Sequence, residues 1–266
     1  MKSDEKLENL KKSISRMERA IVAFSGGVDS TFLLKICVDV LGRENVIAVT
    51  AVSPTYQEEE IEEARAFAKS MGIEHLIIHT HEMENDKFVS NPRERCYFCK
   101  KELFSELKRI ASQHGVRYVL DATNKDDESD FRPGMRALRE EGVISPLREA
   151  GITKEEIRYF SKKLGLPTYD KPSQACLASR FPYGEKITEE KLKMVKEAER
   201  FLKMLGFKVV RVRHHGRVAR IEVGREEMKK ILENDIRTKI YERFREIGYV
   251  WVCLDLMGYR SGSMNV

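Results

Sequence analysis

The chain has 266 residues, and its 48 Lys and Arg against 43 Asp and Glu leave a formal net charge of +5. A chain of this length has room for about two domains of roughly 150 residues each. The charge is too small to require a nucleic-acid partner, and no apolar run approaches the roughly 18 residues of a membrane span. The charged N-terminal sequence lacks the apolar core of a secretory signal, and five cysteines are an odd number. We therefore expect a cytoplasmic protein without a disulfide scaffold.

Short apolar runs alternate with amphipathic stretches in the first part of the chain. Strands that alternate with helices predict an α/β domain with a parallel sheet and right-handed crossovers, and ligands then bind at the carboxyl ends of the strands. The predicted strands are Ala20–Phe24, Val46–Val52, Glu74–His79, Arg117–Leu120 and a short Val143–Ile144. The predicted helices are Thr31–Leu41, Glu58–Met71, Lys101–Gln113 and Lys154–Leu164.

The pattern changes after about Tyr183. Alternation with a period of two predicts an antiparallel hairpin with His215 and Gly216 at its turn. The elements predicted in this part are the helix Glu189–Leu205, the strands Val209–Arg213 and Val218–Val223, the helix Glu226–Leu232 and the strand Tyr249–Leu256. We therefore expect residues 1–183 to form the parallel-sheet domain and residues 184–266 to form a smaller α+β domain.

The strongest local motif is SGGVDS, which starts at Ser25 and lies between a predicted strand and a predicted helix. Gly26 and Gly27 permit a tight turn whose N–H groups form an anion nest, and the start of a helix adds partial positive charge. The hydroxyls of Ser25 and Ser30 can donate to phosphate oxygens, and Asp29 can bind Mg²⁺ or orient a phosphate-bound partner. An ordinary glycine turn with helix caps is the alternative, but the position between strand and helix favours a phosphate loop.

This loop has neither the Lys of a Walker A motif nor the spacing of G-x-G-x-x-G. It resembles the PP-loop of the adenine nucleotide α-hydrolase-like ATP pyrophosphatases. The resemblance implies that the loop holds pyrophosphate, that ATP is split between its α and β phosphates, and that a substrate oxygen is adenylylated. Because AMP is a good leaving group, a nitrogen or sulfur nucleophile would then displace it. We also place Ser53, directly after the second predicted strand, among the nucleotide-binding residues.

Four of the five cysteines fall into two pairs. Cys37 on an apolar helix face and Cys253 in the last predicted strand are expected in the core, since a buried free cysteine behaves as a small hydrophobe. Cys96 and Cys99 form a C-x-x-C motif whose basic neighbours favour thiolates. Two cysteines at a helix start, a zinc site and a redox-active dithiol are the alternatives. Structural zinc needs two further ligands, and the sequence has no second C-x-x-C.

The fifth cysteine, Cys176, lies among small residues in a connector rich in Pro and Ser, with Arg180 four positions later. A buried connector cysteine is the alternative. Thiolates from Cys96, Cys99 and Cys176 would leave one iron of a cubane without a protein ligand, and that iron could bind and deliver a sulfide. Iron–sulfur ligation suits three cysteines better than tetrahedral zinc does.

Three longer segments carry a resemblance to a known family: Asp121–Gly134 (DATNKDDESDFRPG), Pro172–Gly184 (PSQACLASRFPYG) and Leu254–Asn265 (LDLMGYRSGSMN). Together with the SGGVDS loop, they resemble the LarE family of ATP-dependent pyridinium-3,5-biscarboxylic acid mononucleotide sulfurtransferases. The resemblance implies an enzyme that uses ATP and Mg²⁺ to adenylylate the carboxylates of this mononucleotide and converts them to thiocarboxylates. The product is a precursor of a nickel-pincer nucleotide cofactor.

The resemblance implies one of two sulfur sources. In one, the cysteine at the position of Cys176 gives up its own sulfur and becomes dehydroalanine. In the other, three cysteines hold a [4Fe-4S] cluster that carries the transferable sulfur. Because Cys96 and Cys99 accompany Cys176 here, we expect the cluster route, repeated turnover and an external sulfide or sulfur donor. Sacrificial donation from Cys176 is the alternative.

Polar residues after the fourth predicted strand are expected at the nucleotide. Mg²⁺ prefers carboxylates together with phosphate oxygens, so Asp127 and Asp130 are candidate magnesium ligands. Arg132 can offset phosphate charge, and Asn124 completes the predicted nucleotide-binding set. A solvated acidic turn with a helix cap is the alternative.

Candidate substrate-binding residues lie near Cys176 and in the predicted hairpin. Arg211 and Arg213 share one strand face, and paired guanidiniums suit the carboxylates and phosphate of the substrate. We expect Arg180 in a catalytic position facing anionic groups, and Glu222 in metal binding or charge pairing. An ion pair with a neighbouring carboxylate is the alternative for Arg180, and a solvated strand face is the alternative for the two arginines. The resemblance further implies a homo-oligomer and a substrate-binding or oligomerising role for residues 184–266.

Three other functions compete with this interpretation. Some tRNA thiolases also combine a PP-loop with three cluster cysteines, but this sequence lacks flanking zinc-knuckle cysteines and its charge is only +5. An amide-forming ligase, such as an NAD or GMP synthetase, would leave the three cysteines idle. A nucleotide-binding regulatory module would bind ATP without releasing pyrophosphate.

Overall fold

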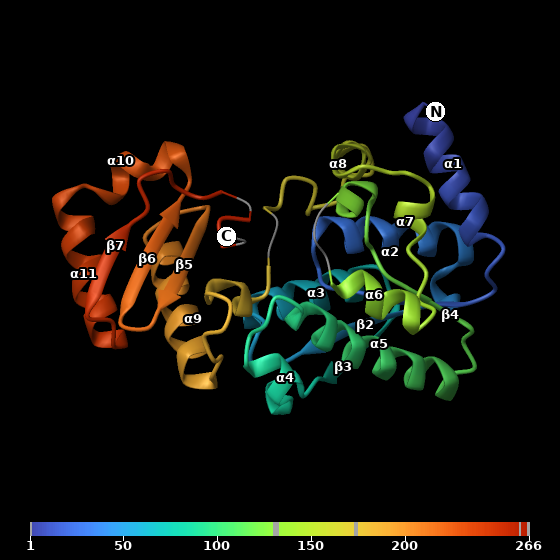
Figure 1. Cartoon of the computed structure of the whole chain (residues 1–266). Coiled ribbons are helices and arrows are strands. Elements are labelled where there is room, and N and C mark those ends of the chain that lie inside the picture. The colour runs from blue at the N-terminus through green and yellow to red at the C-terminus, as the bar shows by residue number, and fades with distance from the viewer. Residues whose placement is uncertain (1, 130–132, 173–174, 261, 265–266) are drawn as a thin grey trace. The chain divides into compact units, whose positions relative to one another are not determined.

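The computed structural model describes residues 2–129, 133–172, 175–260 and 262–264. The chain forms two compact units (Figure 1). The first unit comprises Met1–Glu82 and Arg93–Gln174, and the second comprises Met83–Pro92 and Ala175–Val266. The functional roles that we assign to residues 1–183 and 184–266 stay predictions.

The first unit contains a four-stranded parallel sheet in the order β3-β2-β1-β4. Its strands are β1 (Ala20–Ala23), β2 (Val46–Val52), β3 (Glu74–His79) and β4 (Tyr118–Leu120). In the register, Ala20 pairs with Val46 on one side and with Tyr118 on the other. The predicted α/β class is therefore confirmed, whereas the predicted fifth strand is a single bridge between Leu120 and Ile144.

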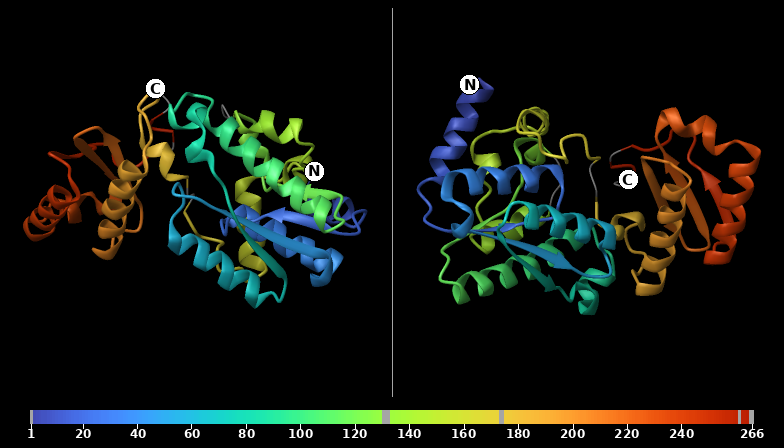
Figure 2. Two further views of the ribbon diagram at one scale, coloured as in Figure 1. Left: turned by 90° about the horizontal axis from the view of Figure 1, so that it is seen from below. Right: turned by 180° about the vertical axis from the view of Figure 1, so that it is seen from behind.

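Helices cover both faces of this sheet (Figure 2). One face packs against α1 (Ser3–Ile14), α2 (Val28–Leu41), α3 (Glu58–Ser70) and α8 (Lys154–Lys163), and the other against α5 (Arg95–Gln113) and α6 (Gly134–Glu140). Alternate residues of β1 supply the two cores, because Ala20 and Val22 face the first group and Ile21 faces the second. Burial on both faces explains why the strands are continuous apolar runs.

The strand order of the sheet changes direction between the neighbouring strands β1 and β4. The helix that follows β1 covers one face of the sheet, and the helix that follows β4 covers the other. Such a switch point opens a crevice at the carboxyl ends of the strands, where α/β proteins bind ligands. The SGGVDS loop follows β1, and the polar segment that begins at Asp121 follows β4. The fold therefore brings both predicted nucleotide-binding segments to one edge of the sheet.

The second unit contains a three-stranded sheet in the order β5-β6-β7. Strands β5 (Val210–His215) and β6 (Val218–Val223) are antiparallel, and β7 (Trp251–Leu254) is parallel to β6. His215 is the last residue of β5, so the predicted turn at His215 and Gly216 is one residue early. Helices α9 (Glu189–Met204), α10 (Met228–Ile231) and α11 (Asn234–Ile247) pack apolar side chains on one face of this sheet.

A short segment far upstream in the sequence belongs to the second unit. Met83–Pro92 contains α4 (Asp86–Val89), and its Asn91 adopts a left-handed backbone with φ of 55°. The Asn91 side-chain amide donates to the carbonyl of Pro182 at 2.6 Å, and its own carbonyl accepts from the N–H of Gly184 at 2.9 Å. These bonds fix the connector that follows Cys176.

The remaining α-helix of the first unit is α7 (Pro146–Glu149), and short 3₁₀ segments link several elements of both units. Among the described residues, no helix has the length and apolar character needed to cross a bilayer.

Candidate functional site

Gly26 gives the SGGVDS loop its shape. Its φ of +67° lies in the left-handed region, and a Cβ added there would approach the Cβ of Ala64 to 3.2 Å. Glycine alone adopts this conformation without steric cost. Gly27 differs, because it has an ordinary φ of −81° and serves as the N-cap of α2.

Ser25 and Ser30 stabilise the turn of the SGGVDS loop by hydrogen bonds within it. Ser30, which is 3% exposed, donates through its hydroxyl to the carbonyl of Gly27 at 3.2 Å and accepts from the N–H of Ser25 at 3.2 Å. The hydroxyls of Ser25 and Ser30 are 3.1 Å apart. The loop is therefore preorganised, and it presents the start of α2, whose first N–H groups lack helical partners, to an anion.

Asp29 has one paired and one unpaired carboxylate oxygen. Its Oδ2 forms an ion pair with the ammonium of Lys154, the first residue of α8. Its Oδ1 is buried and has no hydrogen-bond partner among the residues that the structure describes. A buried carboxylate oxygen without a partner destabilises the fold unless a ligand pairs with it. Mg²⁺ is a suitable ligand, because it binds carboxylate oxygens. The donor chemistry of Asp29 therefore fits a magnesium ligand.

Asp121 lies at the end of β4, across the switch point from the loop. Its Oδ2 is 3.3 Å from Nζ of Lys100, and its Oδ1 accepts from the N–H of Thr123 at 2.8 Å. Burial alone would raise the pKa of Asp121, but Lys100 and Thr123 outweigh burial and hold this pKa below its ordinary value. Asp121 is therefore an ionised carboxylate that anchors Lys100 at this edge of the sheet.

The segment after Asp121 is folded by its own side chains. The N–H of Asn124 donates to Oδ2 of Asp127 at 2.9 Å, and Oδ1 of Asn124 accepts from the N–H of Asp126 at 2.9 Å. Asp126 in turn accepts from the N–H of Lys154 at 2.8 Å. Asn124 and Asp127 thus have structural roles, and their roles toward nucleotide and magnesium stay predictions. The other two predicted residues of this segment, Asp130 and Arg132, lie outside the described residues.

Ser53 follows β2, as predicted, and its hydroxyl bonds to Glu82 and lies 2.8 Å from the hydroxyl of Thr55. Glu82 is 1% exposed, and its Oε2 has no hydrogen-bond partner in the described ranges. The hydroxyl of Ser53 is thus engaged with its neighbours, and its role toward nucleotide stays a prediction.

Cys96 and Cys99 occupy the first turn of α5, three residues apart and hence on one side of the helix. Cys96 is exposed and Cys99 is partly buried. Burial would lower the pKa of Lys100, but Asp121 and the thiolates of Cys99 and Cys96 outweigh burial and raise it. Within the described ranges, no three His, Cys, Asp or Glu side chains converge as a metal site.

Cys176 belongs to the second unit, where it is the partly buried N-cap of the 3₁₀ turn Leu177–Arg180. Arg180 is 1% exposed and donates from Nε and Nη2 to the two carboxylate oxygens of Glu199 at 2.8 and 3.0 Å. Its Nη1 donates to the carbonyls of Ala175 at 2.8 Å and Cys176 at 3.2 Å. Arg180 therefore forms the ion pair named above as the alternative, and through it holds the turn that carries Cys176.

Glu199 lies on α9 and also accepts from the N–H of Val212 in β5 at 3.0 Å. Burial would raise the pKa of Glu199, but Arg180 outweighs burial and keeps this pKa below its ordinary value. The bidentate Arg180–Glu199 pair thereby links the Cys176 turn to the sheet.

Arg211 and Arg213 lie on the sheet face opposite the apolar core, and both are buried, so the solvated strand face is excluded. Arg213 donates from Nη2 to Oε2 of Glu222 at 2.7 Å and from Nη1 to the carbonyl of Ser179 at 3.1 Å. Its buried Nε has no partner within the described part of the chain. The guanidinium of Arg211 lies 5.0 Å from the ring centre of Tyr259. Burial, followed by the charge of Arg180, lowers the pKa of Arg211.

We call this group of ionised side chains the charged cluster. It consists of four arginines and three carboxylates of the described part of the chain: Arg180, Arg211, Arg213, Arg220, Glu199, Glu222 and Asp255. Glu222 is fully buried and accepts from Ser263 at 2.8 Å in addition to its arginines. One net positive charge and the unpaired Nε of Arg213 make the charged cluster suitable for an anion.

Comparison with known proteins places the chain in a family. A model of the NAD synthase family matches residues 4–96, which contain the SGGVDS loop. The pyridinium-3,5-bisthiocarboxylic acid mononucleotide synthase of Lactiplantibacillus plantarum is 39% identical over 95% of this chain and 91% of its own length. The chain belongs to the LarE family.

The chain is also similar to other proteins. An uncharacterized protein of Synechocystis is 47% identical over 98% of this chain and 97% of its own length. One chain of the glutamine-hydrolyzing GMP synthase from Archaeoglobus fulgidus is 26% identical over 69% of this chain and 64% of its own length. This chain therefore shares its loop-bearing region with NAD synthases, which confirms the PP-loop resemblance.

The two cysteines expected in the core have different surroundings in this LarE-family chain. Cys37 is fully buried, and burial raises its pKa far above the ordinary range, so it is an inert thiol. The prediction for Cys253 is wrong, because Cys253 is exposed beside Trp251 on the edge strand β7. An apolar strand predicts burial only when both faces are covered, and one face of β7 is open.

Sequence reasoning missed Lys154, Glu199 and the ion pair between Lys100 and Asp121 as parts of the site. Lys154 and Glu199 act on residues 125 and 19 positions away, so neither has a local signal. Lys100 directly follows the C-x-x-C motif, and its basic character was the available signal.

Proposed function

We propose that this protein is an ATP-dependent sulfurtransferase that converts the carboxylates of pyridinium-3,5-biscarboxylic acid mononucleotide to thiocarboxylates. The observation that carries the proposal is the 39% identity, over nearly the whole of both chains, to the synthase of L. plantarum. The preorganised PP-loop and the Arg180-held turn at Cys176 are the features of this chain that fit such a reaction.

The nucleotide would bind at the switch point between β1 and β4. The backbone N–H groups at Gly26, Gly27 and the start of α2 suit the phosphates, and Ser25 and Ser30 keep the loop in shape. Asp29 is the magnesium ligand best supported by its unpaired oxygen. The further residues of this proposed site are Ser53, Asn124, Asp127, Asp130 and Arg132.

The reaction would proceed in two displacements. A substrate carboxylate oxygen attacks the α-phosphorus of ATP, the bond to the β-phosphate oxygen breaks, and pyrophosphate leaves. A sulfur nucleophile then attacks the activated carbonyl carbon, and AMP leaves with the bonding electrons. Arg211 and Arg213 of the charged cluster would bind the anionic groups of the substrate, while Glu222 fixes Arg213. Arg180 acts as a positioning residue for the Cys176 turn.

Cys96, Cys99 and Cys176 would hold a [4Fe-4S] cluster, which when bound supplies transferable sulfur replenished from an external sulfide. The donor chemistry fits, because three thiols are present and iron–sulfur clusters are held by cysteine sulfurs. Direct donation from Cys176 is the second route, and the partial exposure of its thiol on an ordered turn favours that possibility.

The decisive experiment is anaerobic turnover with the pyridinium dicarboxylate mononucleotide, ATP, Mg²⁺ and sulfide, followed by mass spectrometry of the small molecules. We expect AMP, pyrophosphate and a thiocarboxylate, and no thiocarboxylate from Cys176→Ala. AMP formation with an amide product from ammonia, or ATP binding without pyrophosphate release, would contradict the proposal.

The sulfur route has its own test. Reconstituted protein should show a cluster absorbance that Cys96→Ala, Cys99→Ala and Cys176→Ala each abolish, whereas Cys37→Ala should retain it. Full cluster content in Cys96→Ala would rule out the three-thiolate site. Loss of one H₂S from the intact mass of the chain after turnover would identify sacrifice of Cys176 instead. The same preparations report the oligomeric state by light scattering, and we expect a homo-oligomer.

A further inference from the structure

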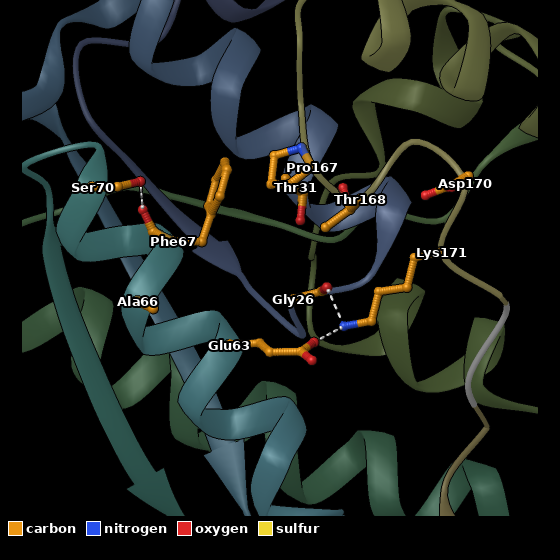
Figure 3. Close-up of a pocket in the computed structure, with 10 residues that line it drawn as sticks. All are labelled: Gly26, Thr31, Glu63, Ala66, Phe67, Ser70, Pro167, Thr168, Asp170 and Lys171. Atoms are coloured by element: carbon orange, nitrogen blue, oxygen red, sulfur yellow. Dashed lines mark hydrogen bonds and ion pairs between the residues drawn. The ribbon is translucent and has the colours of Figure 1, made fainter. Parts of the chain in front are cut away.

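A cleft of about 570 Å³ lies between α2, α3 and the segment Pro167–Lys171 of the first unit (Figure 3). Its size falls in the range of small-molecule sites. The residues that line it are Gly26, Thr31, Glu63, Ala66, Phe67, Ser70, Pro167, Thr168, Asp170 and Lys171. Apart from Gly26, none of these is among the residues that we assign to ATP, magnesium or substrate, so the cleft approaches the PP-loop from its α3 side.

Two buried hydroxyls in the cleft have no partner. Thr31 is 0% exposed and Thr168 is 9% exposed, and the Oγ1 of each makes no hydrogen bond within the described part of the chain. Buried hydroxyls are costly when unpaired. Side chains on two separate elements that both carry this cost, and both line one cleft, indicate a ligand with polar atoms.

The remaining walls suit a flat ring. The phenyl group of Phe67 and the ring of Pro167 are apolar surfaces of the cleft, and the two threonines lie between apolar and polar parts of the lining (Figure 3). Aromatic rings prefer stacked or tilted contact with another ring. A heteroaromatic base would place its face on Phe67 and its polar edge toward Thr31 and Thr168.

The positively charged side chain of Lys171 lies at the PP-loop end of the cleft. The ammonium of Lys171 donates to the carbonyl of Gly26 at 3.1 Å and to Oε2 of Glu63 at 2.6 Å. The Lys171 side chain is 15% exposed and that of Glu63 is 63% exposed. Because the Glu63 carboxylate is well solvated, a phosphate group can replace it on Lys171 at little cost.

We propose that this cleft is a second nucleotide site, which binds a mononucleotide with its base against Phe67, its ring edge at Thr31 and Thr168, and its phosphate on Lys171. Two mononucleotides of the proposed reaction have this chemistry, the AMP product and the pyridinium substrate. Because Lys171 also bonds to Gly26, occupancy of the cleft changes a contact of the PP-loop and links mononucleotide level to ATP binding.

The test is calorimetric titration of the full-length protein with AMP, with nicotinamide mononucleotide as a pyridinium probe, and with α,β-methylene-ATP plus Mg²⁺. Thr168→Val keeps the shape of the side chain but removes its hydroxyl. We expect this substitution to lower the affinity for one of the two mononucleotides about tenfold, while the affinity for the ATP analogue stays unchanged. The mononucleotide whose affinity falls shows whether the AMP product or the pyridinium substrate binds in the cleft.

The same substitution gives a stability signature that a structural hydroxyl would not. Thr168→Val should raise the melting temperature of the ligand-free protein, because it removes an unpaired buried hydroxyl. Thr238→Val, at an exposed position on α11, is the matched control and should change neither binding nor melting temperature. Thr31→Val is the second variant and should behave as Thr168→Val does.

Three results would overturn the proposal. One is the absence of binding by both mononucleotides, and another is unchanged affinity for both in Thr168→Val and Thr31→Val. The third is a parallel loss of mononucleotide and ATP-analogue affinity with full competition between them, which would show a single nucleotide site. None of these measurements needs turnover, so they are independent of the sulfur-transfer reaction.

Discussion

The PP-loop and the charged cluster both suit anions, but they are built in opposite ways. The PP-loop uses a left-handed glycine, two small hydroxyls and backbone N–H groups, with one ion pair at Asp29. The charged cluster uses buried guanidiniums held in place by buried carboxylates, as in Arg180–Glu199 and Arg213–Glu222. The first site depends on backbone geometry and the second on charge pairing, so different substitutions should disable them.

The largest effect is expected from Glu199→Gln in the charged cluster. Removing one partner of a buried ion pair leaves Arg180 uncompensated, and we expect a loss of about 3–5 kcal/mol in the free energy of unfolding. Urea titration measures this loss. Glu197→Gln on the same helix removes a partly exposed carboxylate 3.5 Å from Arg243 and should cost less than about 1 kcal/mol. Equal effects of the two substitutions would show that charge pairing does not hold the charged cluster together.

Gly26→Ala tests the PP-loop, where no buried charge is altered. The φ of +67° and the nearby Ala64 oppose a side chain at this position, so we expect pyrophosphate release to fall about 100-fold, or roughly 3 kcal/mol. At Gly27 a Cβ would meet, of the atoms that the structure describes, only the hydroxyl of Ser25, at 3.3 Å. Gly27→Ala should therefore have a clearly smaller effect in the same assay. A reversed order would disprove the role given to backbone geometry.

Lowering the pH should reduce the stability of the first unit, because Glu156 of α8 then becomes protonated. Burial would raise the pKa of Glu156, but Lys6, Thr153 and Ser3 outweigh it and lower this pKa to about 2. A carboxylate whose folded pKa is depressed stabilises the fold above its unfolded pKa of about 4.3, and this contribution disappears as the pH falls toward 2. We expect the free energy of unfolding to fall by about 2 kcal/mol over this pH range. Glu156→Gln should flatten this part of the stability–pH curve, and an unchanged curve would contradict the assignment.

The smallest effect is expected at the one ion pair described in the PP-loop. Lys154→Met removes the positive charge that pairs with Oδ2 of Asp29 and repels Mg²⁺ at the neighbouring Oδ1, so the Mg²⁺ concentration for half-maximal pyrophosphate release should fall about fivefold. Lys163→Met, at an exposed position of the same helix, is the control and should leave it unchanged. An unaltered magnesium requirement in Lys154→Met would remove Lys154 from the site.

The contrast also explains what the sequence could predict. The PP-loop is a contiguous motif, and the predicted bounds of β2 and β3 agree with the structure because apolar runs between turn signals define buried strands. The start of α5 at Arg95 was missed, since the CYFC stretch lacks residues that favour helices. Helix α11 was missed, although Gly248, which caps its end in the left-handed conformation, is an available stop signal in the sequence.

The charged cluster was the harder part to predict. Arg211 and Arg213 were identified from their residue type, but their burial depends on Glu222 across the hairpin and on Ser179 far upstream. Glu199 gives no local signal, because a glutamate on an amphipathic helix is ordinarily a solvated side chain. Contacts between distant segments, rather than local patterns, created that site.

The placement of Met83–Pro92 has a consequence for how this protein can be divided. The polypeptide passes between the two units at three points, after Glu82, Pro92 and Gln174. A gene fragment that begins at Ala175 would therefore lack Asn91, which holds the connector through Pro182 and Gly184. Neither half is a transferable module, and insertion, deletion or recombination at the 174–175 junction alone would separate residues that fold together.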